Sequence, residues 1–125
     1  MTRPPVDRGE ELLRELDAEI DAEIAAKGGP YEAIRRFKVF YESRLTNEER
    51  LSVHEALRSR LLGRDDDRSH RALITLDQLR ITELTASVKR LRRKLLFRPW
   101  SLGDRDATAA VIRNLEDARS SGQGP

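Results

Sequence analysis

Residues 71–97 have the sequence RALITLDQLRITELTASVKRLRRKLLF, in which apolar side chains return at the spacing of a heptad repeat. The positions that follow this a/d pattern are Ile74, Ile81, Leu84, Val88, Leu91 and Leu95. Isoleucine or valine at most a positions, with leucine at d, is typical of a helix that packs along a second helix. The pattern predicts one long helix over about residues 71–97, with these side chains forming its seam.

Shorter amphipathic helices are expected before this stretch. Residues 8–27 carry apolar side chains three and four positions apart, and Gly28 and Gly29 then supply a stop. Pro30 suits the first turn of a second helix, which should run to about Ser43.

Thr46 and Glu49 have the spacing of a capping box, in which each residue bonds the backbone amide of the other. They predict the start of a third helix that ends at Gly63, before a polar turn over residues 64–69. The side chains expected to be buried on the first three helices are Leu13, Leu16, Ile20, Ile24, Ile34, Phe37, Phe40, Tyr41, Leu51, Val53, Leu57 and Leu61.

A last helix should be capped by Asp104 or Asp106 and should run to about Ala118. The chain of 125 residues is 38% apolar and 37% charged, which is typical of a helical bundle with narrow apolar stripes. We therefore predict an all-α bundle of about four to five helices, organised around the long one. Residues 8–118 should form a single helical domain, with a flexible lead over 1–7 and a disordered tail over 119–125.

Residues that carry most enzyme chemistry are scarce in this chain. It has no cysteine, and its two histidines, His54 and His70, lack the paired spacing of a zinc protease. The acidic residues of the first helix are not matched by the Glu-x-x-His motifs of a di-iron bundle. No serine lies in the context of an activated nucleophile, which needs a neighbouring base on a rigid turn, and no glycine-rich phosphate loop is present. The sequence therefore predicts a non-enzymatic protein without a metal, a cofactor or a small-molecule substrate.

Neither a membrane span nor a leader is expected. No apolar run approaches the roughly 20 residues that cross a bilayer, and the first residues lack the apolar core of a signal peptide. We expect a cytoplasmic protein.

Charge is distributed unevenly along the chain. Residues 1–27 hold eight acidic and four basic side chains, whereas residues 85–100 hold six basic and no acidic ones. The basic stretch and the aromatic residues beside it form the candidate binding site: Lys89, Arg90, Arg92, Arg93, Lys94, Phe97, Arg98 and Trp100. An uneven distribution of this kind points to internal pairing or to an acidic partner.

Three interpretations of this basic stretch remain open. Its cations could contact nucleic-acid phosphates, or they could complement the C-terminal end of their own helix and the acidic first helix. A membrane surface, with the aromatic residues at the interface, is the least favoured of the three. Trp100 could either cap the core or anchor a partner.

The leading functional prediction is a helical interaction protein, acting as an adaptor, an assembly factor or a regulatory subunit. It would bind a protein partner through the basic stretch. Because the long helix would extend past its shorter neighbours, we also expect self-association as a homodimer. The dimer would form through Ile81, Leu84, Val88 and Leu91.

A second interpretation of the same region leads to nucleic acid. Residues 74–79 followed by residues 85–91 resemble the two helices of a helix-turn-helix DNA-binding unit, whose second helix begins with small polar residues. The resemblance implies a nucleic-acid-binding regulator. The usual turn glycine is absent and Ile81–Leu84 continues the heptad, so the single helix is our primary prediction.

Overall fold

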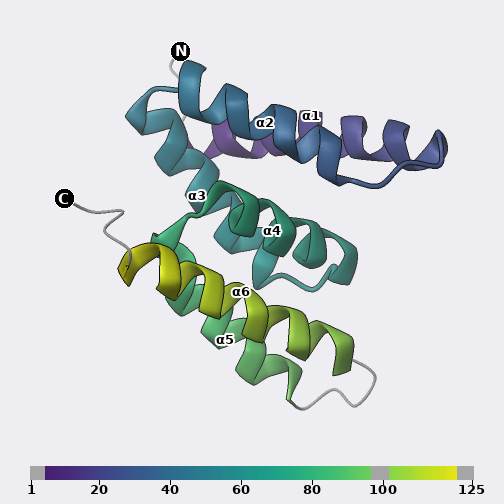
Figure 1. Cartoon of the computed structure of the whole chain (residues 1–125). Coiled ribbons are helices and arrows are strands. Elements are labelled where there is room, and N and C mark those ends of the chain that lie inside the picture. Colours follow the sequence, from purple (N-terminus) through teal and green to yellow (C-terminus); the bar gives the residue numbers. More distant parts are fainter. Residues whose placement is uncertain (1–4, 97–101, 121–125) are drawn as a thin grey trace. The chain divides into compact units, whose positions relative to one another are not determined.

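The computed structural model describes residues 5–96 and 102–120. Over these residues the chain forms six α-helices and one turn of 3-10 helix, and no strand (Figure 1). The elements are α1 (Pro5–Ala25), α2 (Tyr31–Arg44), α3 (Asn47–Leu61), α4 (Asp66–Leu79), η1 (Thr82–Leu84), α5 (Thr85–Leu95) and α6 (Leu102–Ser120). The predicted all-α class is confirmed.

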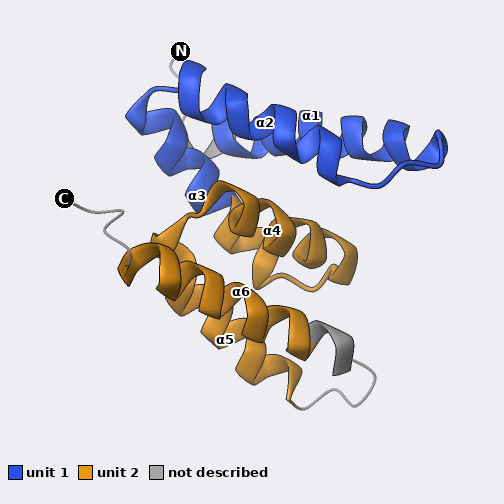
Figure 2. Cartoon of the chain, viewed as in Figure 1, with its two compact units in different colours: residues 1–56 blue, residues 57–125 orange. Residues whose placement is uncertain are grey.

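The chain falls into two compact units, where the sequence predicted one helical domain over residues 8–118 (Figure 2). The first unit covers residues 1–56 and the second covers residues 57–125. Helix α3 contributes its first ten residues to one unit and its last five to the other.

The first and last helices have bounds that overlap the predicted flanking segments. Helix α1 begins at Pro5, inside the predicted lead, because proline is well accommodated in the first turn of a helix. Helix α6 runs on to Ser120, into the predicted tail. It also begins at Leu102, ahead of the predicted caps Asp104 and Asp106.

In the first unit α1 and α2 lie side by side as a helical hairpin (Figure 1). The buried apolar residues of the first unit are Leu12, Leu13, Leu16, Ile20, Ala33, Ile34, Phe37, Tyr41, Leu45, Val53 and Ala56. Three residues that we predicted to be buried are exposed: Ile24 (49%), Phe40 (37%) and Leu51 (60%).

The exposure of two of these residues has a simple geometric cause. Ile24 lies in the last turn of α1, where the chain leaves the hairpin core. On α3 the buried side is set by Ser52, Val53 and Ala56, and Leu51 points away from it. Hydrophobicity alone predicts that a leucine is buried in preference to a serine. The sequence pattern therefore predicts Leu51 on the buried side of α3, where the structure has Ser52.

The capping box at the start of α3 is confirmed. The amide of Glu49 donates to Thr46 Oγ1 over 3.1 Å, and the amide of Thr46 donates to Glu49 Oε1 over 3.0 Å. The hydrogen bond from the Thr46 amide, followed by that from Arg8, lowers the pKa of Glu49. A lowered carboxyl pKa means that this contribution to stability is present above the ordinary pKa and is lost as pH falls through the lowered value.

Gly9 marks a close approach of the α1 and α3 backbones in the first unit. Its amide donates to Ser52 Oγ over 2.7 Å, and both residues are buried. A Cβ atom at Gly9 would lie 2.1 Å from the Ser52 carbonyl oxygen. Only glycine allows the two helices to meet at this distance.

Gly9→Ala should therefore destabilise the protein, although alanine is normally the better helix former. We expect the free energy of unfolding to fall by about 1–3 kcal/mol or more, because the new methyl group collides with backbone that cannot rotate away. Chemical denaturation measures this change. Gly29→Ala is the control, since its Cβ would meet only the Tyr31 side chain at 3.8 Å. A Gly9→Ala protein as stable as the unmodified chain would contradict the close approach.

The prediction of one long helix over residues 71–97 is wrong. Helix α4 ends at Leu79, and Arg80 adopts the left-handed conformation, with φ 53° and ψ 50°. The Arg80 amide then bonds the Asp77 carbonyl at 3.2 Å, and the Ile81 amide bonds the Leu76 carbonyl at 3.1 Å. This pair of bonds is the Schellman motif, which normally uses glycine at the left-handed position.

The turn forms without glycine because its neighbours favour it. Ile81 and Leu76 are both buried, which matches the apolar pairing that accompanies this motif. The guanidinium of Arg80 also pairs with Asp77 at 2.8 Å. The same pair of backbone hydrogen bonds ends α1, where the left-handed residue is Lys27, at φ 64°, rather than the predicted Gly28.

The break changes where the predicted seam is used. Ile81, Leu84, Val88, Leu91 and Leu95 are all buried within the single chain, and Ile74 is partly exposed. Helix α6, which packs against α4, η1 and α5 in the second unit, covers this side (Figure 1). No overhanging seam remains among the described residues, so the homodimer stays a prediction without the argument that led to it.

The turn can be tested by exchanging glycine into it. Arg80→Gly should raise the free energy of unfolding by up to about 1 kcal/mol, because an L-residue in the left-handed region costs roughly 1–2 kcal/mol. Loss of the half-exposed pair with Asp77 offsets less than about 1 kcal/mol of this gain. Gln78→Gly, in the last turns of α4, should instead destabilise by about 1 kcal/mol. In one continuous helix both changes would destabilise alike, so equal losses in a denaturation experiment would contradict the turn.

Candidate functional site

Helix α5 exposes five consecutive or near-consecutive cations, which we call the basic face: Lys89, Arg90, Arg92, Arg93 and Lys94. Its other side is buried through Val88, Leu91 and Leu95, whose helical spacing places them together. Burial of that side fixes which way the cations point. Of the predicted site residues, Phe97, Arg98 and Trp100 lie outside the residues that the structure describes.

The basic face is only partly engaged within the chain. Lys89 Nζ forms an ion pair with Glu116 Oε2 of α6 at 3.1 Å, and Lys94 Nζ donates to the Leu62 carbonyl over 3.4 Å. The side chains of Arg90, Arg92 and Arg93 make no hydrogen bond or ion pair with any residue that the structure describes. Three guanidinium groups are therefore available to an external partner.

The charge of the chain separates by unit. Residues 57–125 hold fifteen lysines and arginines against nine aspartates and glutamates, a formal charge of +6. Residues 1–56 hold nine against thirteen, a formal charge of −4. A basic unit of this kind attracts polyanions over several ångströms and loses that attraction as salt is added.

The position of the cations on α5 also supports the interpretation that they complement the C-terminal end of their own helix. Arg92, Arg93 and Lys94 occupy the last turn of the helix, where the last carbonyl groups carry a partial negative charge. Each cation near a helix C-terminus typically contributes about 0.3–1 kcal/mol at low ionic strength, and salt screens this contribution. That gain is compatible with binding, because the guanidinium groups remain exposed.

The connection from α4 through the turn to α5 matches the order of elements in the helix-turn-helix alternative. The small polar residues at the start of α5, however, are not placed to read bases. Thr85 is buried and its hydroxyl donates to the Thr82 carbonyl over 2.7 Å. Ser87 is buried too, and its Oγ accepts from Arg58 Nε over 3.3 Å. Base-specific readout by these two residues is therefore not supported.

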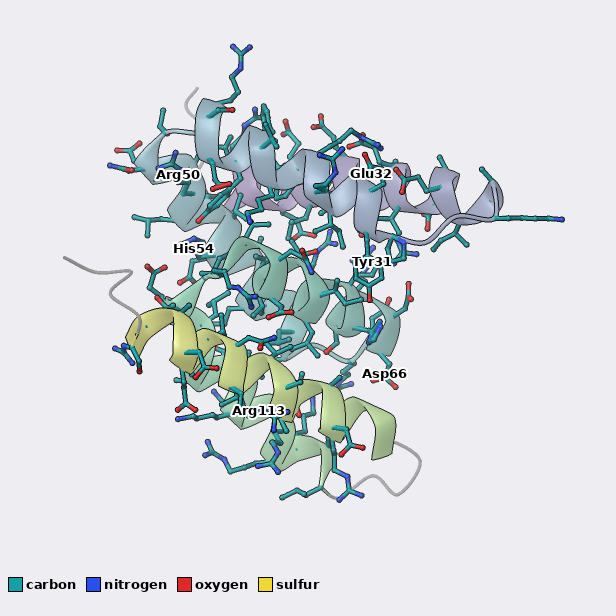
Figure 3. All side chains as sticks on the ribbon, in the orientation of Figure 1. Tyr31, Glu32, Arg50, His54, Asp66 and Arg113 are labelled. Atoms are coloured by element: carbon teal, nitrogen blue, oxygen red, sulfur yellow. The ribbon has the colours of Figure 1, made fainter. Side chains whose placement is uncertain are left out.

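The two histidines have structural surroundings, and Figure 3 labels the first of them, His54. His54 is buried in the first unit and bonds the Tyr41 hydroxyl at 2.5 Å. His70 is exposed and lines, with Asp66 and Lys94, a cavity of about 20 Å³ that is large enough for one water molecule. Among the described residues no three histidine, aspartate or glutamate side chains gather where they could hold a metal ion.

The acidic residues of α1 take part in the packing of the first unit. Glu23 pairs with Arg36 of α2 at 2.6 Å, and Glu19 approaches the same guanidinium at 3.7 Å.

No helix in the described ranges has the length and apolar content needed to cross a bilayer. Comparison of the chain with models of protein families, with curated proteins and with solved structures finds no match.

If the basic face serves binding rather than folding, its arginines can be removed without loss of stability. At a salt concentration that screens the interaction with the helix end, changing Arg90, Arg92 and Arg93 together to Gln should leave the free energy of unfolding within about 0.5 kcal/mol, the usual range for surface changes. Leu91→Ala on the buried side of the same helix should cost about 2–5 kcal/mol. Thermal or chemical denaturation compares the two. A triple variant destabilised as much as Leu91→Ala would show that these arginines support the fold.

Proposed function

We propose that this chain is a non-enzymatic binding protein whose basic face engages the phosphates of nucleic acid. The observation that carries the proposal is the set of three exposed arginines on α5 without a partner among the described residues. Guanidinium groups are suited to phosphate because they present several donors in a fixed plane and stay charged.

The mode of binding follows from what surrounds the basic face. Thr85 and Ser87 are engaged internally, so the proposed contacts go to the phosphate backbone rather than to base edges. Such binding is tolerant of sequence and strongly dependent on salt. The turn between α4 and α5 favours the helix-turn-helix alternative over the single helix. It also allows α5 to pack against α6.

A protein partner on the same surface is the second candidate, and it corresponds to the adaptor, assembly or regulatory role. Leu96 supports it, because this residue lies one helical turn beyond Arg92 and Arg93 and is 53% exposed. An apolar side chain next to arginines is typical of protein interfaces. An acidic protein surface would then replace the phosphates. Neither role involves a catalytic step or a bound cofactor.

Fluorescence anisotropy of labelled duplex DNA, single-stranded DNA and duplex RNA at several salt concentrations tests the proposal. The unmodified chain should bind with an affinity that falls steeply with salt. Changing Arg90, Arg92 and Arg93 to Gln should weaken binding. On duplex DNA it should also flatten the log–log salt dependence, by about 0.9 for each phosphate that the variant no longer neutralises.

A matched control separates the basic face from net charge. Arg14, Lys38 and Arg44 lie in the first unit, and changing them to Gln removes the same number of charges. This variant should bind almost as the unmodified chain does. An equal loss of affinity in the two variants would show that binding depends on net charge and not on the basic face. Absence of binding at low salt would reject the nucleic-acid role and leave the protein partner as the candidate.

A further inference from the structure

The first unit has an open groove that the sequence did not reveal. It lies between α1 and α2 and has a volume of about 280 Å³. Its lining consists of Leu12, Glu15, Leu16, Glu19, Arg36, Phe37 and Phe40. We propose that this groove is the docking site for a basic amphipathic helix of a partner protein. The proposal is independent of the basic face on α5.

The floor of the groove is apolar and well packed. Leu12, Leu16 and Phe37 are nearly inaccessible to water and belong to the hairpin core. Phe40 stands beside them with 37% of its surface exposed, and its ring centroid is 6.4 Å from that of Phe37. An aromatic side chain held at the edge of an apolar depression is the kind of anchor that contributes most to protein binding.

The rim of the groove is acidic. Glu15 and Glu19 of α1 are exposed, and Glu15 has no hydrogen bond or ion pair with another described residue. The one lining cation, Arg36, is surrounded by Glu23 at 2.6 Å, Glu19 at 3.7 Å and Glu32 at 3.8 Å. The first unit as a whole carries a formal charge of −4. Charge complementarity therefore selects a cationic occupant.

The extent of the groove along α1 matches a helical occupant, because its lining residues there run from Leu12 to Glu19, about two helical turns. The groove runs between two helices, as in complexes where an amphipathic helix lays its apolar side into a hydrophobic groove. Apolar residues of the partner at i, i+3, i+4 and i+7 would meet the floor, and its lysines or arginines would meet Glu15 and Glu19.

The occupant is a different protein rather than a second copy. Helix α5 is a basic amphipathic helix of this chain, but its apolar residues Val88, Leu91 and Leu95 are buried. It could fill the groove of another copy only by leaving α6. That would expose the core of the second unit to water.

A pair of designed peptides tests the inference on the full chain. The first has leucine at i, i+3, i+4 and i+7 of a helix with lysine and arginine at the other positions; the second has glutamate in place of every cation. By fluorescence anisotropy the basic peptide should bind and the acidic peptide should bind at least about tenfold more weakly. Binding of both peptides alike, or of neither, would overturn the proposal.

Substitutions then locate the site. Phe40→Ala should weaken binding of the basic peptide by about tenfold or more, as expected of an aromatic anchor. Val39→Ala is the matched control, because Val39 is the adjacent residue, is 57% exposed and does not line the groove. Glu15→Lys should also weaken binding. It leaves the floor of the groove intact, so it tests whether the peptide binds there even if the Phe40→Ala protein does not fold. Unchanged binding in Glu15→Lys would overturn the acidic role of the rim.

Two further measurements separate the groove from the basic face and from self-association. Changing Arg90, Arg92 and Arg93 to Gln should leave peptide binding unchanged, so failure of the α5 proposal and failure of this one give different results. Light scattering reports on a second copy. A mass that rises with protein concentration in the unmodified chain but not in Phe40→Ala would assign the groove to self-association and overturn the proposed occupant.

Discussion

The left-handed conformation of Arg80 is the constraint on which the second unit depends. It ends α4, turns the chain and allows η1 and α5 to pack on α6. A straight helix through residues 71–97 would present its apolar stripe along one line, and a single short neighbour could cover only part of it. The turn divides that stripe between two helices, and so Leu84, Val88 and Leu91 become core residues of one chain.

Exposure of the basic face follows from that packing. Once Val88, Leu91 and Leu95 are buried, helix geometry leaves Arg90, Arg92 and Arg93 on the outside. The partners that the structure shows for this face come from the second unit: the Glu116 side chain and the Leu62 carbonyl. The charge of +6 on this unit and −4 on the other gives the chain two surfaces of opposite preference. Under the two proposals, the second unit would bind an anionic ligand and the first unit a cationic protein.

The first unit depends on the close approach of two helix backbones. Gly9 lets α1 reach the backbone of α3, and the capping box between Thr46 and Glu49 fixes where α3 begins. The hairpin then buries Phe37 but leaves Phe40 at its edge, where α1 contributes Glu15 and Glu19. The groove is thus a consequence of how the two helices of the hairpin pair.

The sequence by itself determined the all-α class, the start of α3 and the identity of most core residues, because helical periodicity and capping are local properties. It also placed the cations of α5. It did not reveal the turn at Arg80, since without glycine that turn depends on the joint burial of Leu76 and Ile81. Nor did it reveal that α6 covers the seam, or that Phe40 borders a groove. Those features were decided by tertiary packing, because one amphipathic stripe can be buried by several different neighbours and local sequence does not choose among them.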